Sequence, residues 1–108
     1  MSQTAPGPEP IVPVTPHPKL EELVAVLAHL RAPGGCPWDR EQTHASLLPY
    51  VVEEAHELVE AVETGTRDDL LEELGDVLLQ VVFHARLAQE DPEAPFDLDA
   101  VARRTAAK

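Results

Sequence analysis

Residues 53–76 read EEAHELVEAVETGTRDDLLEELGD, and this stretch predicts a helical hairpin. Gly65 follows a helical run, and Thr66 with Asp69 resembles the capping box that begins a new helix. Two pairs of acids lie at equal distances from the glycine in the sequence. They are Glu54 with Glu57 before it and Glu73 with Asp76 after it. If the chain reverses at Gly65, the two pairs face each other.

Apolar residues recur at helical spacing on both arms of this hairpin. The first arm carries Val51, Val52, Ala55, Leu58, Val59 and Val62. The second carries Leu70, Leu71, Leu74, Val77, Leu78, Val81 and Ala85. On a helical wheel each acid pair lies at the edge of its apolar stripe, displaced by the same rotation. We therefore expect four carboxylates beside the shared core of the hairpin, where a divalent cation would offset their repulsion.

A solvated helix face is the structural alternative for these acids. Residues 53–76 contain ten of the twenty acids but only one base, Arg67, so few salt bridges can offset the like-charge pairs. Oxygen ligands alone favour the hard ions Mg²⁺ and Mn²⁺, whereas zinc favours Cys and His. Glu53 lies beside Glu57 on the wheel but further from the core. It is a candidate ligand for a second ion, or a base that accepts a proton from attacking water.

Length and composition predict a single all-α domain. The chain has 108 residues, is 44% hydrophobic, and nowhere alternates with the period of a strand. Its net charge of −12 argues against binding to nucleic acids or anionic membranes. Neither a membrane span nor a secretory signal is evident, and the single Cys36 cannot form an internal disulfide. These features favour a cytoplasmic location.

The chain outside the hairpin divides into a leader and further helices. Residues 1–18 contain six of the eleven prolines and are predicted to be disordered, which leaves residues 19–108 as one helical domain. A first helix is expected over residues 19–31, followed by a loop through residues 36–39. A second helix begins after His44, with Pro49 in its first turn. The third helix extends to about Ala88, and Asp97 can cap a short C-terminal segment.

One face of the third helix bears on oligomerisation. Leu79, Phe83 and Leu87 lie on the side away from the main stripe, so the helix is apolar on nearly all sides. With three main helices in the chain, a second copy is the expected cover, as a homodimer or tetramer that completes a four-helix-type bundle. In the alternative, the N-terminal helix or the C-terminal tail covers this face.

Three segments together resemble a known family. The sequences EEAHE at 53–57 and ELGD at 73–76 resemble the EExxE…ExxD pattern of the all-α nucleoside triphosphate pyrophosphohydrolases. CPWDREQTHASL at 36–47 and ELGDVLLQVVFHA at 73–85 are similar to the MazG branch. The resemblance implies an oligomeric enzyme that uses Mg²⁺ and attack by water at the α-phosphate. It would hydrolyse NTPs or dNTPs to NMP and pyrophosphate, in nucleotide-pool house-cleaning or regulation.

The resemblance also implies roles for individual residues. The metal ligands are Glu54, Glu57, Glu73 and Asp76, and Glu53 is the candidate base. Trp38 would stack on the nucleotide base, with loop packing as its alternative. Asp39, Gln42 and His44 would contact base or ribose, with helix capping or loop contacts as their alternatives.

MazG proteins usually continue with a basic stretch, so the chain resembles a truncated form or a short relative. Four bases could replace that stretch in neutralising the triphosphate: Arg86, Arg103, Arg104 and Lys108. The alternative for each is a solvated surface charge.

Two other classes of function compete with this interpretation. Glu53 and His56 have the spacing of a di-iron carboxylate motif, but His56 points away from Glu54 on the wheel. A catalytically silent helical module could instead present its acidic face to a basic partner. Stabilisation by Mg²⁺ with a nucleotide would distinguish an enzyme from such a module.

Overall fold

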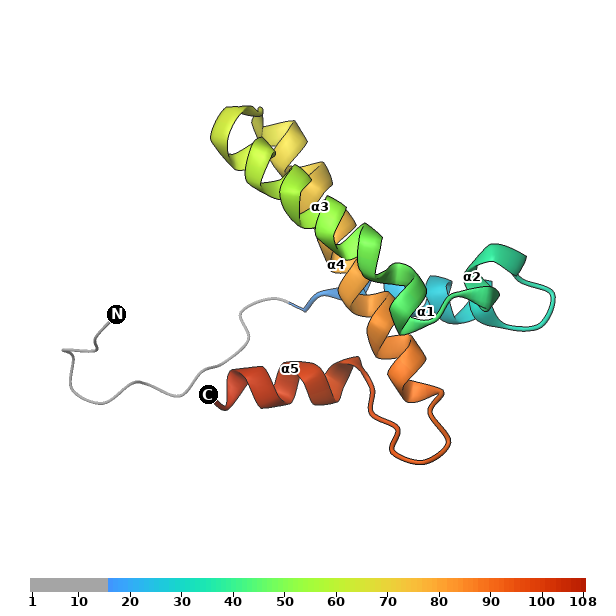
Figure 1. Ribbon diagram of the computed structural model, residues 1–108. Coiled ribbons are helices and arrows are strands. Elements are labelled where there is room, and N and C mark those ends of the chain that lie inside the picture. The colour runs from blue at the N-terminus through green and yellow to red at the C-terminus, as the bar shows by residue number, and fades with distance from the viewer. Residues whose placement is uncertain (1–15) are drawn as a thin grey trace, which may run out of the picture.

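The computed structural model describes residues 16–108, so most of the predicted disordered leader, residues 1–15, lies outside the described part. Every regular element in residues 16–108 is a helix (Figure 1). The elements are α1 (Pro18–Arg31), α2 (Pro37–Glu41), α3 (His44–Thr64), α4 (Arg67–Gln89) and α5 (Leu98–Ala106). The predicted all-α class is confirmed. No helix in this part of the chain is long and apolar enough to cross a membrane.

Helices α3 and α4 form the predicted antiparallel hairpin, which projects from the rest of the molecule in Figure 1. The capping box at the start of α4 is present: Thr66 Oγ1 accepts from Asp69 N at 3.1 Å, and Asp69 Oδ2 accepts from Thr66 N at 3.0 Å. Gly65 has a φ of −92°, so it does not adopt the left-handed conformation that glycine often takes after a helix. A Cβ at Gly65 would instead lie 2.9 Å from the Cα and carbonyl oxygen of Ala61. Close approach of the backbone, rather than positive φ, requires glycine here.

The segment before the hairpin differs from the prediction in two ways. Residues Pro37–Glu41 form the short helix α2, where a loop was predicted. A second capping box, between Thr43 and Ser46, starts α3 at His44. Pro49 therefore lies in the second turn of α3, and the prediction that it occupies the first turn was wrong. The reciprocal bonds of the capping box fix where the helix begins.

The buried core lies where α1 crosses the hairpin. It consists of Leu27 of α1, Leu47 of α3, and Val82 and Phe83 of α4, with Leu87 packed against it. The N-terminal helix α1 therefore covers Phe83 and Leu87 on this face of α4, as in the alternative to a second copy, whereas Leu79 stays exposed. Burial of these side chains supplies the hydrophobic stabilisation that joins α1 to the hairpin.

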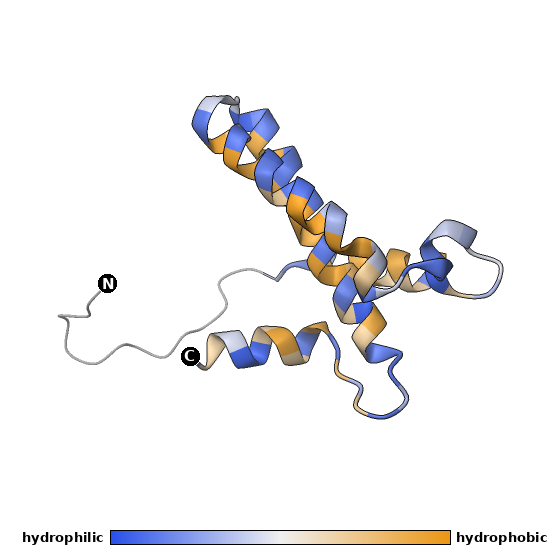
Figure 2. Cartoon of the chain, viewed as in Figure 1, coloured by the Kyte–Doolittle hydropathy of each residue, from blue (hydrophilic) through white to orange (hydrophobic). Residues whose placement is uncertain are grey.

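The main apolar stripe of the hairpin is mostly exposed, because α3 and α4 bury only its inner edge. Ala61 is buried and Leu58, Leu70 and Val77 are half-buried. The outer residues remain accessible: Val52, Val59, Val62, Leu71, Leu74, Leu78 and Val81. Figure 2 shows apolar residues along the length of both arms. The two stripes are therefore wider than the contact between two helices can cover.

Helix α5 follows a turn after α4 and contacts α4 again. Asp97 caps it as predicted, because its Oδ1 accepts from Ala100 N at 2.9 Å. Leu98 packs against the buried core, which ties the start of α5 to the base of the hairpin.

Candidate active site

Three of the four predicted metal ligands converge between the arms of the hairpin. Glu54 of α3 and Glu73 and Asp76 of α4 each offer a carboxylate oxygen, and these atoms all lie within 4.8 Å of one another. All three residues are half-buried, whereas the fourth predicted ligand, Glu57, is exposed. The antiparallel register set at Gly65 places one carboxylate from α3 against two from α4.

Burial and mutual repulsion perturb two of these carboxylates. The pKa of Glu54 is raised by burial and then by the negative charge of Asp76. The pKa of Glu73 is also raised, by burial and then by the charges of Glu57 and Asp76. Glu57 is therefore close enough to act on the cluster although it lies at its edge. Each shift means that the folded chain disfavours the charged form of that carboxylate.

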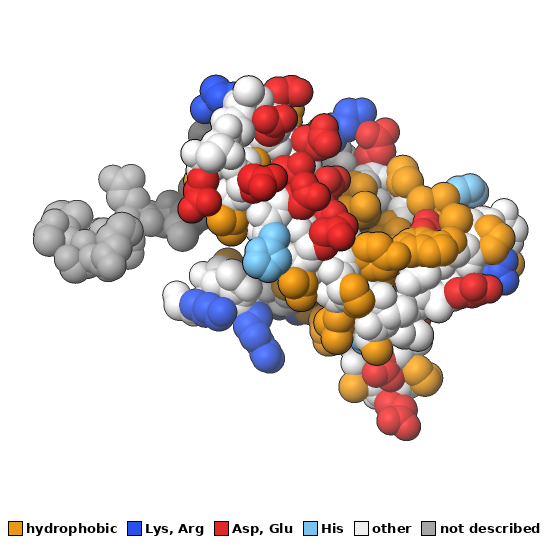
Figure 3. Space-filling model, turned by 45° about the horizontal axis from the view of Figure 1, so that its top comes forward, with side chains coloured by type: hydrophobic (Ala, Val, Ile, Leu, Met, Phe, Trp, Pro, Cys, Tyr) orange, Lys and Arg blue, Asp and Glu red, His pale blue; other side chains and the backbone are white. Residues whose placement is uncertain are grey.

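The donor set fits a hard divalent cation. Glu54 Oε2 and Glu73 Oε1 are buried without a hydrogen-bond partner, which is uncommon for charged oxygens. Oxygen-only ligands suit Mg²⁺ or Mn²⁺, and a cation between the arms would offset the repulsion that raises the pKa values. Figure 3 shows Asp and Glu side chains gathered over the hairpin, with apolar side chains beside them.

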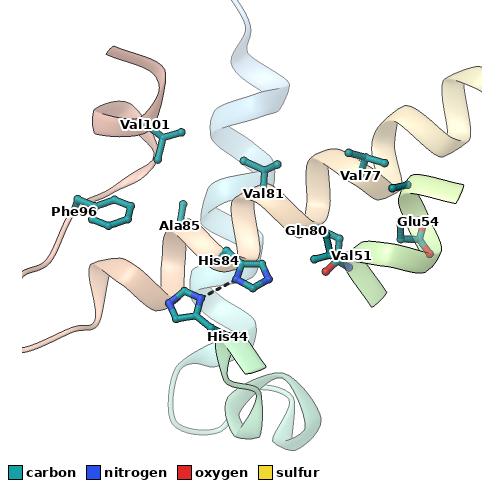
Figure 4. Close-up of a pocket in the computed structure, with 11 residues that line it drawn as sticks. His44, Val51, Glu54, Val77, Gln80, Val81, His84, Ala85, Phe96 and Val101 are labelled. Carbon is teal, nitrogen blue, oxygen red and sulfur yellow. Dashed lines mark hydrogen bonds between the residues drawn. The ribbon is translucent and has the colours of Figure 1, made fainter. Parts of the chain in front are cut away.

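A pocket adjoins the carboxylate cluster. It has a volume of about 380 Å³ and lies between the hairpin and the C-terminal segment (Figure 4). Its lining consists of His44, Val51, Glu54, Ala55, Val77, Gln80, Val81, His84, Ala85, Phe96 and Val101. Glu54 belongs to both the cluster and the pocket wall. The remaining wall is mostly apolar, as is typical of small-molecule sites.

Two histidines stand together at one end of this pocket. The Nδ1 atoms of His44 and His84 lie 2.7 Å apart, and the two rings stack with centroids 5.0 Å apart. Burial lowers the pKa of His84, and the neighbouring His44 lowers it further. The Nε2 atom of His84 is buried without a partner. Of the predicted substrate-contacting residues, His44 is the one that the structure brings to the pocket.

Trp38 in α2 and Gln42 directly after it do not line the pocket. The Trp38 ring meets the ring of Tyr50 edge-on, with centroids 5.9 Å apart. The Gln42 side chain donates to the carbonyl of Trp38 at 2.9 Å and accepts from the hydroxyl of Ser46 at 2.7 Å. Gln42 thus makes the loop contacts given as its alternative, and stacking of Trp38 on a base stays a prediction.

Asp39 and Arg86 also have partners within the chain. The carbonyl oxygen of Asp39 accepts from the guanidinium of Arg31, which joins α1 to α2. Arg86 Nε lies 3.0 Å from a carboxylate oxygen of Glu90, which also pairs with Arg31. Neither Asp39 nor Arg86 lines the pocket, and their proposed contacts with substrate stay predictions.

Glu53 and His56 are exposed on α3 and lie outside the three-carboxylate cluster. The cluster contains no histidine, so the structure gives no support to a di-iron site built on this pair. The role of Glu53 as a base stays a prediction.

Sequence reasoning missed three residues of the pocket: Gln80, Phe96 and Val101. For Gln80 a signal existed, because Asp76, Gln80 and His84 recur at four-residue spacing and share one side of α4. For Phe96 and Val101 none existed, because only the tertiary placement of the C-terminal segment brings them to the pocket.

Comparison with known proteins agrees with this geometry. The sequence pattern of the MazG nucleotide pyrophosphohydrolase domain matches residues 42–108. The chain is 60% identical over 70 residues to a nucleoside triphosphate pyrophosphohydrolase/pyrophosphatase MazG of Thermotoga maritima, covering 65% of this chain and 28% of that protein. It is 51% identical over 96 residues to a nucleoside triphosphate pyrophosphohydrolase of Mycolicibacterium smegmatis, covering 89% of this chain and 28% of that protein.

A third relative, the nucleoside triphosphate pyrophosphohydrolase of Escherichia coli K12, is 45% identical over 80 residues, covering 73% of this chain and 30% of that protein. The all-α hairpin with paired carboxylates and these matches define the class, and the chain belongs to the MazG nucleotide pyrophosphohydrolase domain family. It spans less than a third of the length of these curated relatives.

Proposed function

We propose that this chain hydrolyses nucleoside triphosphates, ribo or deoxy, to NMP and pyrophosphate with Mg²⁺, by attack of water at the α-phosphate. The observation that carries the proposal is the convergence of Glu54, Glu73 and Asp76 beside a pocket that Glu54 lines, with partnerless buried oxygens on Glu54 and Glu73. The names of the relatives give the reaction class that the site would serve. A role in nucleotide-pool house-cleaning or regulation follows from that reaction.

The carboxylates have separate tasks in this proposal. Glu54, Glu73 and Asp76 hold the ion between the arms, and Glu57 reaches it from the edge of the cluster. A bound divalent cation would neutralise phosphate charge and lower the pKa of water near it. Glu53, exposed one residue before Glu54, accepts the proton that the attacking water loses. The pocket receives the nucleoside because Glu54 forms part of its wall.

Homo-oligomerisation belongs to the proposal as well. The outer stripe of the hairpin, defined by Val52, Val59, Leu71, Leu74 and Leu78, is apolar and exposed along both arms. Gly75 lies beside this stripe on α4, and a Cβ there would meet nothing within 4 Å. A second copy that packs its own hairpin against the stripe would bury these side chains and use the close approach that Gly75 permits. Light scattering on the purified chain measures the resulting homodimer or tetramer.

A product assay tests the reaction. The chain is incubated with a panel of NTPs and dNTPs plus Mg²⁺, and NMP with pyrophosphate is resolved from NDP with phosphate. In water enriched in ¹⁸O, attack at the α-phosphate places the label in NMP. Label in pyrophosphate would contradict the proposed attack, and NDP with phosphate would contradict the proposed bond. Omission of Mg²⁺ should abolish turnover, with Mn²⁺ as a possible substitute.

Thermal unfolding gives a second test that does not depend on turnover. A ligand that binds only the folded chain at 100 times its Kd adds about 2.7 kcal/mol of stability. Mg²⁺ with a non-hydrolysable nucleotide should therefore raise the melting temperature. If neither Mg²⁺ nor the nucleotide changes the melting temperature, the result would favour the silent interaction module instead. The predicted cytoplasmic location rests on the sequence and stays a prediction.

A further inference from the structure

A second hollow lies where the start of α1 meets the outer side of α4. This groove has a volume of about 540 Å³ and is lined by residues 16–20, Leu23 and Leu78. Leu20 and Leu78 are exposed apolar side chains, and Leu23 packs against the buried core. The groove shares no residue with the pocket beside the carboxylates. Exposed apolar hollows of this kind mark sites of interaction.

The lining of the groove selects an apolar occupant. Lys19 is the one Lys, Arg, Asp or Glu among the lining residues. Its amine lies 2.9 Å from a carboxylate oxygen of Glu22, and 86% of its side chain is exposed, so it lies at the rim. The other walls are mainly proline and leucine. A charged ligand would lose its hydration in such a groove and find no paired charge in return.

The chain carries an apolar segment beside this groove. Residues 11–14 read Ile-Val-Pro-Val, and Thr15 alone separates them from Pro16, which belongs to the groove wall. Ile11, Val12 and Val14 are the only isoleucine, leucine or valine residues in positions 1–15. Because an extended chain spans at most about 3.6 Å per residue, Val14 stays within about 7 Å of Pro16, and Ile11 within about 18 Å. The whole segment is therefore within reach of the groove.

Two properties favour this segment over a separate molecule. A short tether gives a linked segment an effective concentration of about millimolar, far above that of a second copy in a dilute sample. The ring of Pro13 also restricts its own φ before binding, so fewer conformations are lost when the segment docks. Neither advantage is available to an occupant that arrives from solution.

We propose that residues 11–14 dock in this groove and cover Leu20 and Leu78 of the same chain. Leu78 also belongs to the outer stripe against which a second copy would pack. The docked segment and a second copy therefore compete for this side chain, and docking limits self-association. The competition rests on the oligomerisation proposed above, whereas the docking does not.

One methyl group reports the docking. Ile11 is the only isoleucine of the chain, so labelling of isoleucine Cδ1 gives a single methyl signal in NMR spectra. In wild type this methyl should show cross-peaks to leucine methyl groups, at a shift that differs from its position in urea. Leu78→Ser should remove the cross-peaks to Leu78 and move the signal toward its position in urea. The control is Leu71→Ser, since Leu71 is exposed on the same helix outside the groove, and it should leave the signal in place. A wild-type signal that coincides with the signal in urea would overturn the proposal.

A mixed sample shows which chain supplies the segment. Chains labelled at isoleucine alone are mixed with chains labelled at leucine alone, and cross-peaks between the two labels are sought. Their absence, together with cross-peaks in chains that carry both labels, supports docking within one chain. Cross-peaks in the mixture would mean that the segment of one copy fills the groove of another, which contradicts the proposal.

Self-association tests the competition. Ile11→Ser cannot disturb the helices directly, and it should strengthen association by uncovering Leu78. If the segment is docked in about nine of ten chains, the competent fraction is about one tenth, so its release should lower the dissociation constant at least about tenfold. Gln3→Ser, outside the segment, is the control and should associate as wild type does. Equal association in Ile11→Ser and wild type would refute the competition. If no chain associates while the methyl reports docking, the proposed oligomerisation fails and the docking stands.

Discussion

The Nδ1 atoms of His44 and His84 lie 2.7 Å apart, and this contact joins the first turn of α3 to the last third of α4. Because each atom is a ring nitrogen, one must donate and the other accept. The contact therefore requires at least one neutral imidazole.

The first prediction is a loss of stability at mildly acidic pH. Burial and His44 lower the pKa of His84, so the unfolded chain binds a proton there more tightly than the folded chain does. Well above pH 6.5, the ordinary pKa of histidine, His84 is neutral in both states and does not change the stability of the fold. As pH decreases through that value, the unfolded chain takes up the proton first, so the free energy of unfolding falls. Urea unfolding of wild type from pH 8 to pH 5.5 measures the loss.

His84→Gln isolates this effect, and His29→Gln is its control because His29 is exposed on α1. His84→Gln should be about 1 kcal/mol less stable at pH 8, since one hydrogen bond is lost, and its stability should depend less on pH. The raised pKa values of Glu54 and Glu73 are common to all three chains and cancel in the comparison. Identical pH dependence in wild type and His84→Gln would refute the assignment.

A second prediction concerns Asp76, which we propose as a metal ligand. Asp76→Asn should abolish hydrolysis and weaken Mg²⁺ binding, because one of three converging carboxylates is lost. The metal-free variant should be slightly more stable than wild type, since a charge that raises the pKa of Glu54 is removed. Asp68→Asn, an exposed acid in the first turn of α4, is the control and should behave as wild type. Turnover retained in Asp76→Asn would show that Asp76 is not a ligand.

Mg²⁺ affinity should also depend on pH. Protons compete with the metal for Glu54 and Glu73, whose pKa values are raised, so binding should weaken as pH falls toward those values. Calorimetric titrations of Mg²⁺ between pH 8 and pH 5.5, in two buffers of different ionisation enthalpy, measure the affinity and the protons released. Affinity that stays constant over this range would place the ion elsewhere.

The hairpin was predictable because its determinants are local. Helical periodicity, the capping box at Thr66 and the spacing of the acids are all read within one stretch of sequence. The sequence left open whether the N-terminal helix or a second copy covers Phe83, because a helical wheel shows the apolar faces of a helix but not which neighbour buries each face. The same limit applies to the pocket: Phe96 reaches it through tertiary packing, whereas Gln80 shares the face of Asp76 and was within reach of the sequence.

A fourth prediction concerns the exposed side of α4. Gly75→Ala should stabilise the isolated chain by up to about 1 kcal/mol, because a Cβ there meets no atom within 4 Å and alanine is the better helix former. If a second copy packs closely over Gly75, the added methyl group should weaken association. Sedimentation equilibrium over a range of concentrations measures both the oligomer and its dissociation constant. Association unchanged in Gly75→Ala would move the interface away from this glycine.

The turn at Gly65 gives the opposite expectation for the same substitution. Its φ of −92° is open to any residue, so a backbone argument alone would predict stabilisation by about 0.4–1 kcal/mol in Gly65→Ala. However, the new Cβ would lie 2.9 Å from the Cα and carbonyl oxygen of Ala61, and neither backbone atom can move aside without distorting the end of α3. Overpacking of this kind costs about 1–3 kcal/mol, so the clash should win and the variant should lose stability. Urea unfolding measures the change in the free energy of unfolding for Gly65→Ala, with Gly75→Ala as the matched control of opposite expected sign. A stabilised Gly65→Ala would mean that the turn has room to relax.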